Sequence, residues 1–316
     1  MAPRLGLPAS TPLSRRRLLA LGGAVTLGAL GLAGTACSGD ASDDEADGDG
    51  AGDDDAATGT GATDGFVIVQ RYPSGRTITP GEIRLAVSLA RSDGSLLTDG
   101  PEVLEGVMRN EQGLRIDTIA ATRRGTGLDV PYWSITTTIP KVGLYDIVFE
   151  GAAGDPVPFF VYDPAEVTLP HPGTALPPFD TPTLDDARGV EPICSRTQIG
   201  QEACPFHEVT LTDALASGKP VVYLIGTPAH CQTATCGPGL DFLIDVATEL
   251  GDRAVFVHAE VYADADATEI APAVTEYALD YEPVIWVTDA TGTVVRRIDI
   301  VWDEDELREM LTASIG

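Results

Sequence analysis

The first folded region shows short runs in which apolar residues alternate with polar ones. Such alternation is typical of strands with one buried face and one wetter face. The runs cover residues 66–69, 83–89, 133–139, 144–149 and 158–162. Turn clusters at residues 92–95 and 124–127 separate some of them. Repeated short strands with Gly-rich turns over about a hundred residues predict an all-β domain at 65–163, built as a β-sandwich.

The pattern changes after residue 163. Residues 164–190 are rich in Pro, Asp and Thr, which predicts a linker or an irregular lead-in. Residues 220–225 form a continuous apolar run typical of a buried strand, and residues 239–250 carry apolar side chains at helical spacing. Further helices are predicted at 209–216, 270–279 and 303–313, and further strands at 254–261, 284–287 and 294–300. The second domain, residues 191–316, is therefore predicted to be α/β.

The first 36 residues show the features of an export signal. Positive charge at Arg4 and at residues 15–17 is followed by an apolar run, residues 18–33, of signal-peptide length. Residues 14–19 resemble a twin-arginine signal, and residues 34–37 resemble a bacterial lipobox. The lipobox resemblance implies a lipid on Cys37, although Gly34 stands where Leu is usual. An ordinary secretory signal and an uncleaved anchor are the alternatives.

The segment after Cys37 is strongly acidic. Residues 38–64 contain only small residues, Thr, Ser and acids, which predicts a disordered, extended tether at 37–64. The chain has a formal net charge of −28; beyond Cys37, 16 basic and 48 acidic residues give −32. Such a charge excludes nucleic acid and anionic headgroups as electrostatic partners. We therefore expect a lipid-anchored protein on the extracytoplasmic side of the cell membrane.

The β domain carries a loose resemblance of its own. Tyr132-Trp133-Ser134-Ile135 followed by Gly143-Leu144-Tyr145-Asp146-Ile147 resembles the closing hairpin of immunoglobulin-like bacterial domains. This resemblance implies an immunoglobulin-like fold. The domain contains no His and no Cys, so we expect it to be a spacer or a docking module.

The chemistry is concentrated in residues 227–238, which contain Cys231 and Cys236 between a predicted strand and a predicted helix. Unpaired backbone N–H groups at a helix start stabilise a thiolate there. This arrangement resembles the redox site of the thioredoxin fold, and the order β-α-β-α-β-β-α resembles that fold too. The spacing is C-x4-C instead of C-x2-C, and Gly239 stands where the second cysteine of a Cys-Gly-Pro motif belongs. A five-residue offset still permits a disulfide.

Residues 281–284 resemble the thioredoxin segment in which a cis proline faces the active cysteines. The resemblance implies that Pro283 is cis and that the backbone of Glu282 is presented to a partner. The resemblance covers about residues 173–316, and this part of the chain resembles exported bacterial thioredoxin-like proteins. The site predicted from it consists of Cys231, Cys236 and Pro283, with Cys236 favoured as nucleophile because it lies nearer the helix start.

Cys194 and Cys204 lie before the first clear strand of the second domain. Four cysteines in an oxidising compartment favour two disulfides, so we expect a structural Cys194–Cys204 disulfide. A second thiol pair or a metal site with His207 is the alternative. His230 adjoins Cys231 and is expected either to tune that thiol or to be a surface residue, whereas His258 is expected to be a core residue.

Three functions remain open. The first is a thiol-disulfide oxidoreductase or redox-responsive protein that acts on exported protein thiols or on a membrane redox partner, without a cofactor. The second is copper handling, because the Sco copper chaperones resemble this chain; Cys231, Cys236 and His258 would then bind Cu(I). The third is a non-catalytic binding module with structural disulfides.

Overall fold

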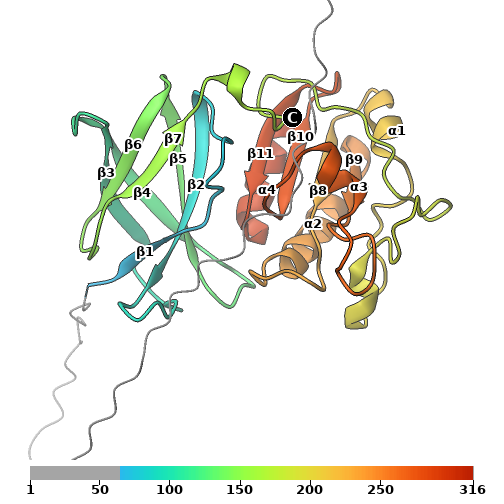
Figure 1. Cartoon of the computed structure of the whole chain (residues 1–316), viewed down its shortest axis with the longest axis horizontal. Helices are drawn as coiled ribbons and strands as arrows, with labels where there is room; N and C mark the ends of the chain where they lie inside the picture. Colours follow the sequence, from blue (N-terminus) through green and yellow to red (C-terminus); the bar gives the residue numbers. More distant parts are fainter. Residues whose placement is uncertain (1–64, 316) are drawn as a thin grey trace, which may run out of the picture. The chain divides into compact units, whose positions relative to one another are not determined.

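The computed structural model describes residues 65–315, which belong to one compact unit. Cys37, the export signal and the acidic tether lie outside the described residues. The first domain holds seven strands, which Figure 1 shows in blue to green. They are β1 (Val67–Gln70), β2 (Gly81–Ala90), β3 (Val103–Asn110), β4 (Arg115–Arg124), β5 (Tyr132–Ile139), β6 (Gly143–Phe149) and β7 (Val157–Val161).

All seven strands belong to one antiparallel sheet, in the order β1-β2-β5-β4-β3-β6-β7. The expected two-sheet sandwich is therefore not observed, and the immunoglobulin-like assignment is not confirmed. The reason lies in β3 and β4, which the apolar pattern did not predict. These two strands connect β5 to β6 through antiparallel pairing and so join both halves of the domain into one sheet.

The two edges of this sheet approach each other. Phe66, directly before β1, forms a bridge with Ala152, and its carbonyl accepts a hydrogen bond from the Ala153 N–H at 2.7 Å. The Tyr72 hydroxyl donates to the Pro158 carbonyl in β7 at 3.2 Å. The sheet is therefore nearly a barrel.

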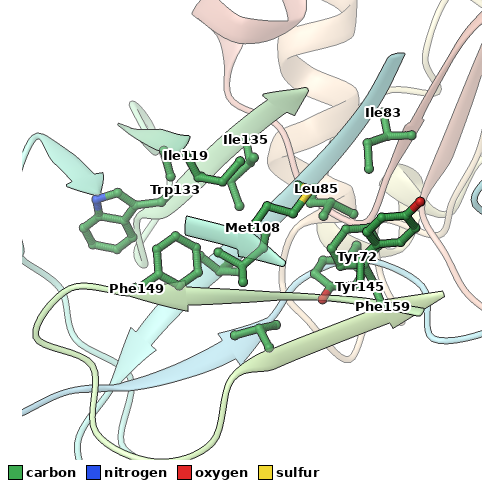
Figure 2. Close-up of a cluster of buried hydrophobic side chains, with 14 of the residues drawn as sticks. Tyr72, Ile83, Leu85, Met108, Ile119, Trp133, Ile135, Tyr145, Phe149 and Phe159 are labelled. Carbon is green, nitrogen blue, oxygen red and sulfur yellow. The ribbon is translucent and has the colours of Figure 1, made fainter. Parts of the chain in front are cut away.

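The core of the first domain fills the inside of the curved sheet. Figure 2 shows side chains from several strands converging there, with Met108 among Leu85, Tyr145 and Phe149. Met108 and Leu85 are fully buried, and Trp133 is buried with its indole N–H donating to the Pro101 carbonyl. Burial of such side chains contributes about 1.5–3 kcal/mol each, which makes this interior the main source of the domain's stability.

The second domain is built on a four-stranded sheet. Its strands are β8 (Val221–Ile225), β9 (Val255–Ala259), β10 (Val284–Thr288) and β11 (Val294–Asp299), in the order β11-β10-β8-β9. Strands β8 and β9 are parallel, whereas β10 is antiparallel to both β8 and β11. This order and these directions are those of the thioredoxin fold, as the sequence predicted.

Two apolar layers cover this sheet. Helices α2 (Cys236–Leu250) and α4 (Glu304–Ile315) pack on the face that carries Val222 and Leu224. Helices α1 (Leu211–Ala216) and α3 (Pro272–Glu276) pack on the face that carries Tyr223 and Ile225. Single-turn helices lie at η1 (Pro164–Glu166), η2 (Ser195–Ile199) and η3 (Gly251–Arg253).

Residues 164–190 pack as an irregular lead-in. Leu169 and Leu176 are buried in the second layer, and the indole N–H of Trp286 donates to the Pro170 carbonyl at 2.9 Å. The Gly173 N–H donates to the Val294 carbonyl, and the Val294 N–H donates to the Thr174 carbonyl, so the contact reaches the start of β11. Leu169 and Leu176 thus add to the apolar core on this face of the second domain.

A buried polar cluster connects β2 and β5 to the start of α4. The Arg84 guanidinium donates to both carboxylate oxygens of Glu306, at 2.9 and 2.7 Å. Tyr132 and Ser134 donate to the same carboxylate. Burial alone would raise the pKa of Glu306, but the Arg84 charge and these hydrogen bonds outweigh it and lower the pKa to about 2. Glu306 is therefore ionised and paired at neutral pH.

Among the described residues, no helix is both long and apolar enough to cross a lipid bilayer.

Candidate functional site

The predicted cysteine pair forms a disulfide at the start of α2. Strand β8 ends at Ile225, the chain loops through residues 226–235, and α2 begins at Cys236. The Cys231 and Cys236 Cα atoms lie 5.9 Å apart, a normal distance for a bridged pair. The expectation that C-x4-C can close a disulfide is confirmed.

The two sulfur-bearing residues differ in exposure. Cys236 is 2 % exposed, whereas Cys231 is partly exposed. The backbone N–H of Cys236, the first residue of α2, donates to the Cys231 sulfur at 3.3 Å. The Thr233 hydroxyl also lies 3.3 Å from that sulfur. The accessible sulfur therefore has the donors that would stabilise a thiolate, one of them at a helix start.

The buried sulfur faces a carboxyl group. The Cys236 Sγ lies 2.7 Å from Oε2 of Glu282. A disulfide sulfur carries no hydrogen, so the hydrogen of this contact must be on the carboxyl group while the disulfide is closed. Burial raises the pKa of Glu282 to about 7, opposed by a hydrogen bond from the Thr227 backbone. The group can therefore hold or release a proton near neutral pH.

The peptide bond between Glu282 and Pro283 is cis, as the thioredoxin resemblance implied. Pro283 approaches the loop closely at Gly226, where an added Cβ would lie 3.2 Å from the proline Cβ and 3.9 Å from the Cys236 Cβ. Glycine at this position thus allows the proline segment to pack beside the disulfide. The side chain of Glu282 was missed at the sequence level, although an acid directly before a proline predicted to face the cysteines was the available signal.

Gly239, which stands where a C-x2-C motif would have its second cysteine, has a packing role. An added Cβ would lie 3.0 Å from the Trp302 ring, whose indole N–H donates to the Gly239 carbonyl at 3.1 Å. Trp302 is 1 % exposed and packs between α2 and the sheet. A larger side chain at this position would meet the ring.

A hollow of about 400 Å³ lies beside the disulfide. It is bounded by the redox loop at Gln232 and Thr233 and by the proline segment at Glu282. Its remaining lining is mostly apolar: Ile225, Val261, Tyr262, Ile270, Val274, Leu279, Asp280, Tyr281 and Ile300. The volume and lining suit one or two apolar side chains of a peptide.

Ser195, the first residue of η2, supports the redox loop. Its hydroxyl accepts a hydrogen bond from the Ala229 N–H at 3.1 Å and lies 3.4 Å from the Thr227 hydroxyl. Its own N–H donates to the buried carboxyl group of Glu260. Ser195 therefore fixes the loop that carries Cys231, a role that sequence patterns did not reveal.

The other two cysteines are free and buried, which corrects the expected Cys194–Cys204 disulfide. Within residues 65–315, the potential metal-ligating groups fall into two clusters: Cys194, Cys204, His207 and His258, and separately Cys231, Cys236 and Glu282. In the first cluster the two free thiols lie beside two imidazoles. Hydrogen bonding from Cys204, followed by the imidazoles, lowers the pKa of Cys194 against the opposing effect of burial.

His258 does not join the redox cysteines as the copper hypothesis required. It alternates with Val257 and Ala259 along β9, so its side chain lies on the same sheet face as Leu224 and Phe256. There it meets Cys204 and His207. The expectation of a buried histidine is confirmed, but the set Cys231, Cys236 and His258 is not brought together.

The remaining histidines have separate surroundings. The His230 ring lies 3.1 Å from the Gln198 side chain and packs edge-on to Tyr262. His171 is buried, with its Nδ1 3.1 Å from the Leu169 carbonyl. The His230 ring therefore contacts η2, and the His171 ring holds part of the lead-in.

Fold and site together define a thioredoxin-fold domain with a disulfide at the start of its first long helix, a cis proline and an adjacent carboxyl group. No family model and no curated protein matches the chain. Two solved structures of Chlorobium tepidum proteins are similar to it over 46 % of its length. One, described as a proposed thiol:disulfide interchange protein DsbE, has 14 % identity, 99 % coverage of its own chain and a TM-score of 0.33. The other, described as a thiol:disulfide interchange protein of the thioredoxin family, has 15 % identity, 98 % coverage and a TM-score of 0.32.

Proposed function

We propose that the chain is a thiol-disulfide oxidoreductase that exchanges disulfides with exported proteins through Cys231 and Cys236. The observation that carries the proposal is the asymmetry of this disulfide. One sulfur is accessible and receives an N–H from the helix start, whereas the other is buried against the Glu282 carboxyl group. A purely structural disulfide has no need of either arrangement.

The exchange is balanced in thiols, electrons and protons. A partner thiolate attacks the Cys231 sulfur, the Cys231–Cys236 bond breaks, and Cys236 leaves as a thiolate that takes the proton of Glu282. A second partner thiol, deprotonated, then attacks the partner sulfur of the mixed disulfide and releases Cys231. The partner dithiol becomes a disulfide and the protein becomes a dithiol; the reverse sequence reduces a partner, with Glu282 as the base.

Exposure supports Cys231 as the sulfur that partners reach, the opposite of the order favoured by sequence position. Cys236 begins α2 but is 2 % exposed, so an incoming thiol meets Cys231 first. The hollow beside Thr233 and Glu282 would then receive the partner's apolar side chains. Access outweighs proximity to the helix start in this assignment, since exchange requires contact between sulfur atoms.

A redox titration of the full chain tests the proposal. The protein is equilibrated with dithiol buffers of defined potential, quenched with a mass-tagged alkylating agent and analysed by mass spectrometry. We expect two tags to be gained together at a potential above about −300 mV, the upper range of structural disulfides. The Cys231→Ser/Cys236→Ser variant gives the background from the other cysteines. A pair that stays oxidised under strong dithiol would identify a non-catalytic binding module instead.

Trapping separates the roles of the two cysteines. A Cys236→Ser variant should accumulate mixed disulfides with partners through Cys231, and a Cys231→Ser variant should accumulate far fewer. The reverse result would make Cys236 the attacking sulfur.

The proposal places the protein on the extracytoplasmic face of the cell membrane, anchored by a lipid on Cys37. Its support is the lipobox-like segment 34–37 and the acidic segment that follows. Metabolic labelling with a fatty acid, lost in Cys37→Ala, tests the anchor. Unlabelled wild-type protein would instead be secreted or held by its signal segment.

A further inference from the structure

We infer that Cys194, Cys204, His207 and His258 form a structural binding site for one Zn²⁺ ion. All four residues are buried, at 0 %, 3 %, 1 % and 0 % exposure respectively. One ligand atom from each lies within 4.8 Å of the other three. Two thiolates and two imidazoles in a closed, buried set are the donor combination of structural zinc sites.

The distances between the ligand atoms match a tetrahedron around zinc. Zn–N bonds of about 2.0–2.1 Å place two nitrogen ligands about 3.3 Å apart, and a Zn–S bond of about 2.3 Å places sulfur about 3.5 Å from nitrogen. The observed distance from His258 Nδ1 to His207 Nε2 is 3.3 Å, and that from Cys204 Sγ to His258 Nδ1 is 3.4 Å. The side chains are therefore already spaced for one ion at their centre.

The tautomer of His258 also suits a ligand. Its Nε2 lies 3.0 Å from the Gly226 carbonyl, which can only accept, so the ring hydrogen is on Nε2. The lone pair of Nδ1 then points to Cys204 and His207. A carbonyl that fixes the distal N–H of an imidazole is the usual outer support of a metal-binding histidine.

Charge and surroundings favour zinc over a disulfide. The cluster lies among apolar side chains, including Phe206, Leu224 and Leu240. Two thiolates with Zn²⁺ have no net charge, so the site can be buried without an uncompensated ion. A Cys194–Cys204 disulfide would leave both imidazoles facing sulfur atoms with little to bind.

The ion would fasten residues 191–207 to β9, next to the redox loop. Cys194, Cys204 and His207 come from residues 191–207, and His258 comes from β9. The hydroxyl of Ser195, next to Cys194, accepts a hydrogen bond from the Ala229 N–H. The Nε2–H of His258 donates to the Gly226 carbonyl. Both ends of the site therefore reach the segment that leads to Cys231.

Metal analysis of the full chain tests the inference directly. We expect about one zinc per chain by elemental mass spectrometry and, after exchange, the visible spectrum of tetrahedral Co²⁺ with thiolate ligands. Cys204→Ser and His258→Gln should each lose stoichiometric zinc. The Cys231→Ser/Cys236→Ser variant, which alters the other potential ligand cluster, should retain it.

Measurements on wild-type protein test the inference even if a ligand variant fails to fold. A strong chelator should lower the melting temperature, and added Zn²⁺ should restore it. Reduced wild-type protein that contains no zinc and takes none from a zinc buffer would overturn the inference. A Cys194–Cys204 disulfide found by peptide mapping of the non-reduced protein would overturn it too.

Discussion

The Glu282→Gln substitution tests the protonation of the carboxyl group beside the disulfide. The amide is neutral and can donate a hydrogen to the Cys236 sulfur, so it imitates the protonated acid inferred from the 2.7 Å contact in the oxidised state. The side chains have nearly the same shape, so the packing of Pro283 beside Gly226 should be preserved. The variant therefore removes one property, the ability to ionise.

The magnitude follows from the pKa, which burial raises from 4.5 to about 7. A group with a raised pKa in the folded state gives full stability below its unfolded pKa and loses it as the pH rises toward the folded pKa. Between pH 4.5 and pH 7, wild-type stability should thus fall relative to Glu282→Gln. At pH 8 the difference approaches about 3 kcal/mol, since each pKa unit corresponds to about 1.4 kcal/mol.

Urea denaturation of the oxidised protein from pH 4 to pH 8.5 measures this difference. We expect the variant and the wild type to be closely similar near pH 4 and the variant to be more stable above pH 7. Glu269→Gln, which replaces an exposed carboxylate with the same amide, is the matched control. A Glu282→Gln difference that does not change with pH would refute the argument that this carboxyl group is protonated beside the closed disulfide.

Other predictions concern the same two domains. Arg84→Met should cost about 3–5 kcal/mol in urea denaturation, because it leaves the buried Glu306 carboxylate without its cation. The loss should be smaller in the Arg84→Met/Glu306→Gln double variant, and equal losses would contradict the pairing. Glu306 should also stabilise the wild type less as the pH falls from about 4.5 toward 2, a loss that Glu306→Gln should lack. Gly239→Cys should cost about 1–3 kcal/mol, because its side chain meets the Trp302 ring. Titration of free thiols should show that the introduced thiol does not exchange with Cys236, and a disulfide between the two would disprove the packing role.

The sequence predicted the second domain well because its signals are local. Continuous apolar runs marked β8 and β10, helical spacing marked α2, and the cis proline and the disulfide followed from the thioredoxin resemblance. The first domain was predicted only in part. Strand β3 buries Leu104 and Met108 on either side of Gly106, and β4 buries only Ile119 and Ala121, so neither shows a strong apolar alternation. Without these strands, one sheet could not be distinguished from two.

Side-chain clusters that depend on tertiary structure were harder to predict. The sequence predicts a buried His258, but its neighbours come from residues 194–207, about fifty positions earlier, and no periodicity indicates that contact. The thioredoxin resemblance gives a role only to the backbone of Glu282, not to its side chain. The carboxyl group becomes important through the 2.7 Å contact with Cys236, which requires the loop, the helix and the proline segment together.

The contact between Glu282 and Cys236 also sets how many protons accompany two electrons. Reduction of an ordinary disulfide to two thiols takes up two protons from solvent, so its potential changes by about 59 mV per pH unit. Here one of those protons already resides on Glu282 while that group is protonated, and the reaction only moves it to the neighbouring sulfur. In a pH range where Glu282 is protonated beside the disulfide and ionised beside the thiol, reduction draws a single proton from solvent, and the slope falls to about 30 mV per pH unit. The buried carboxyl group would thus make the redox poise of the protein less sensitive to the acidity of its surroundings.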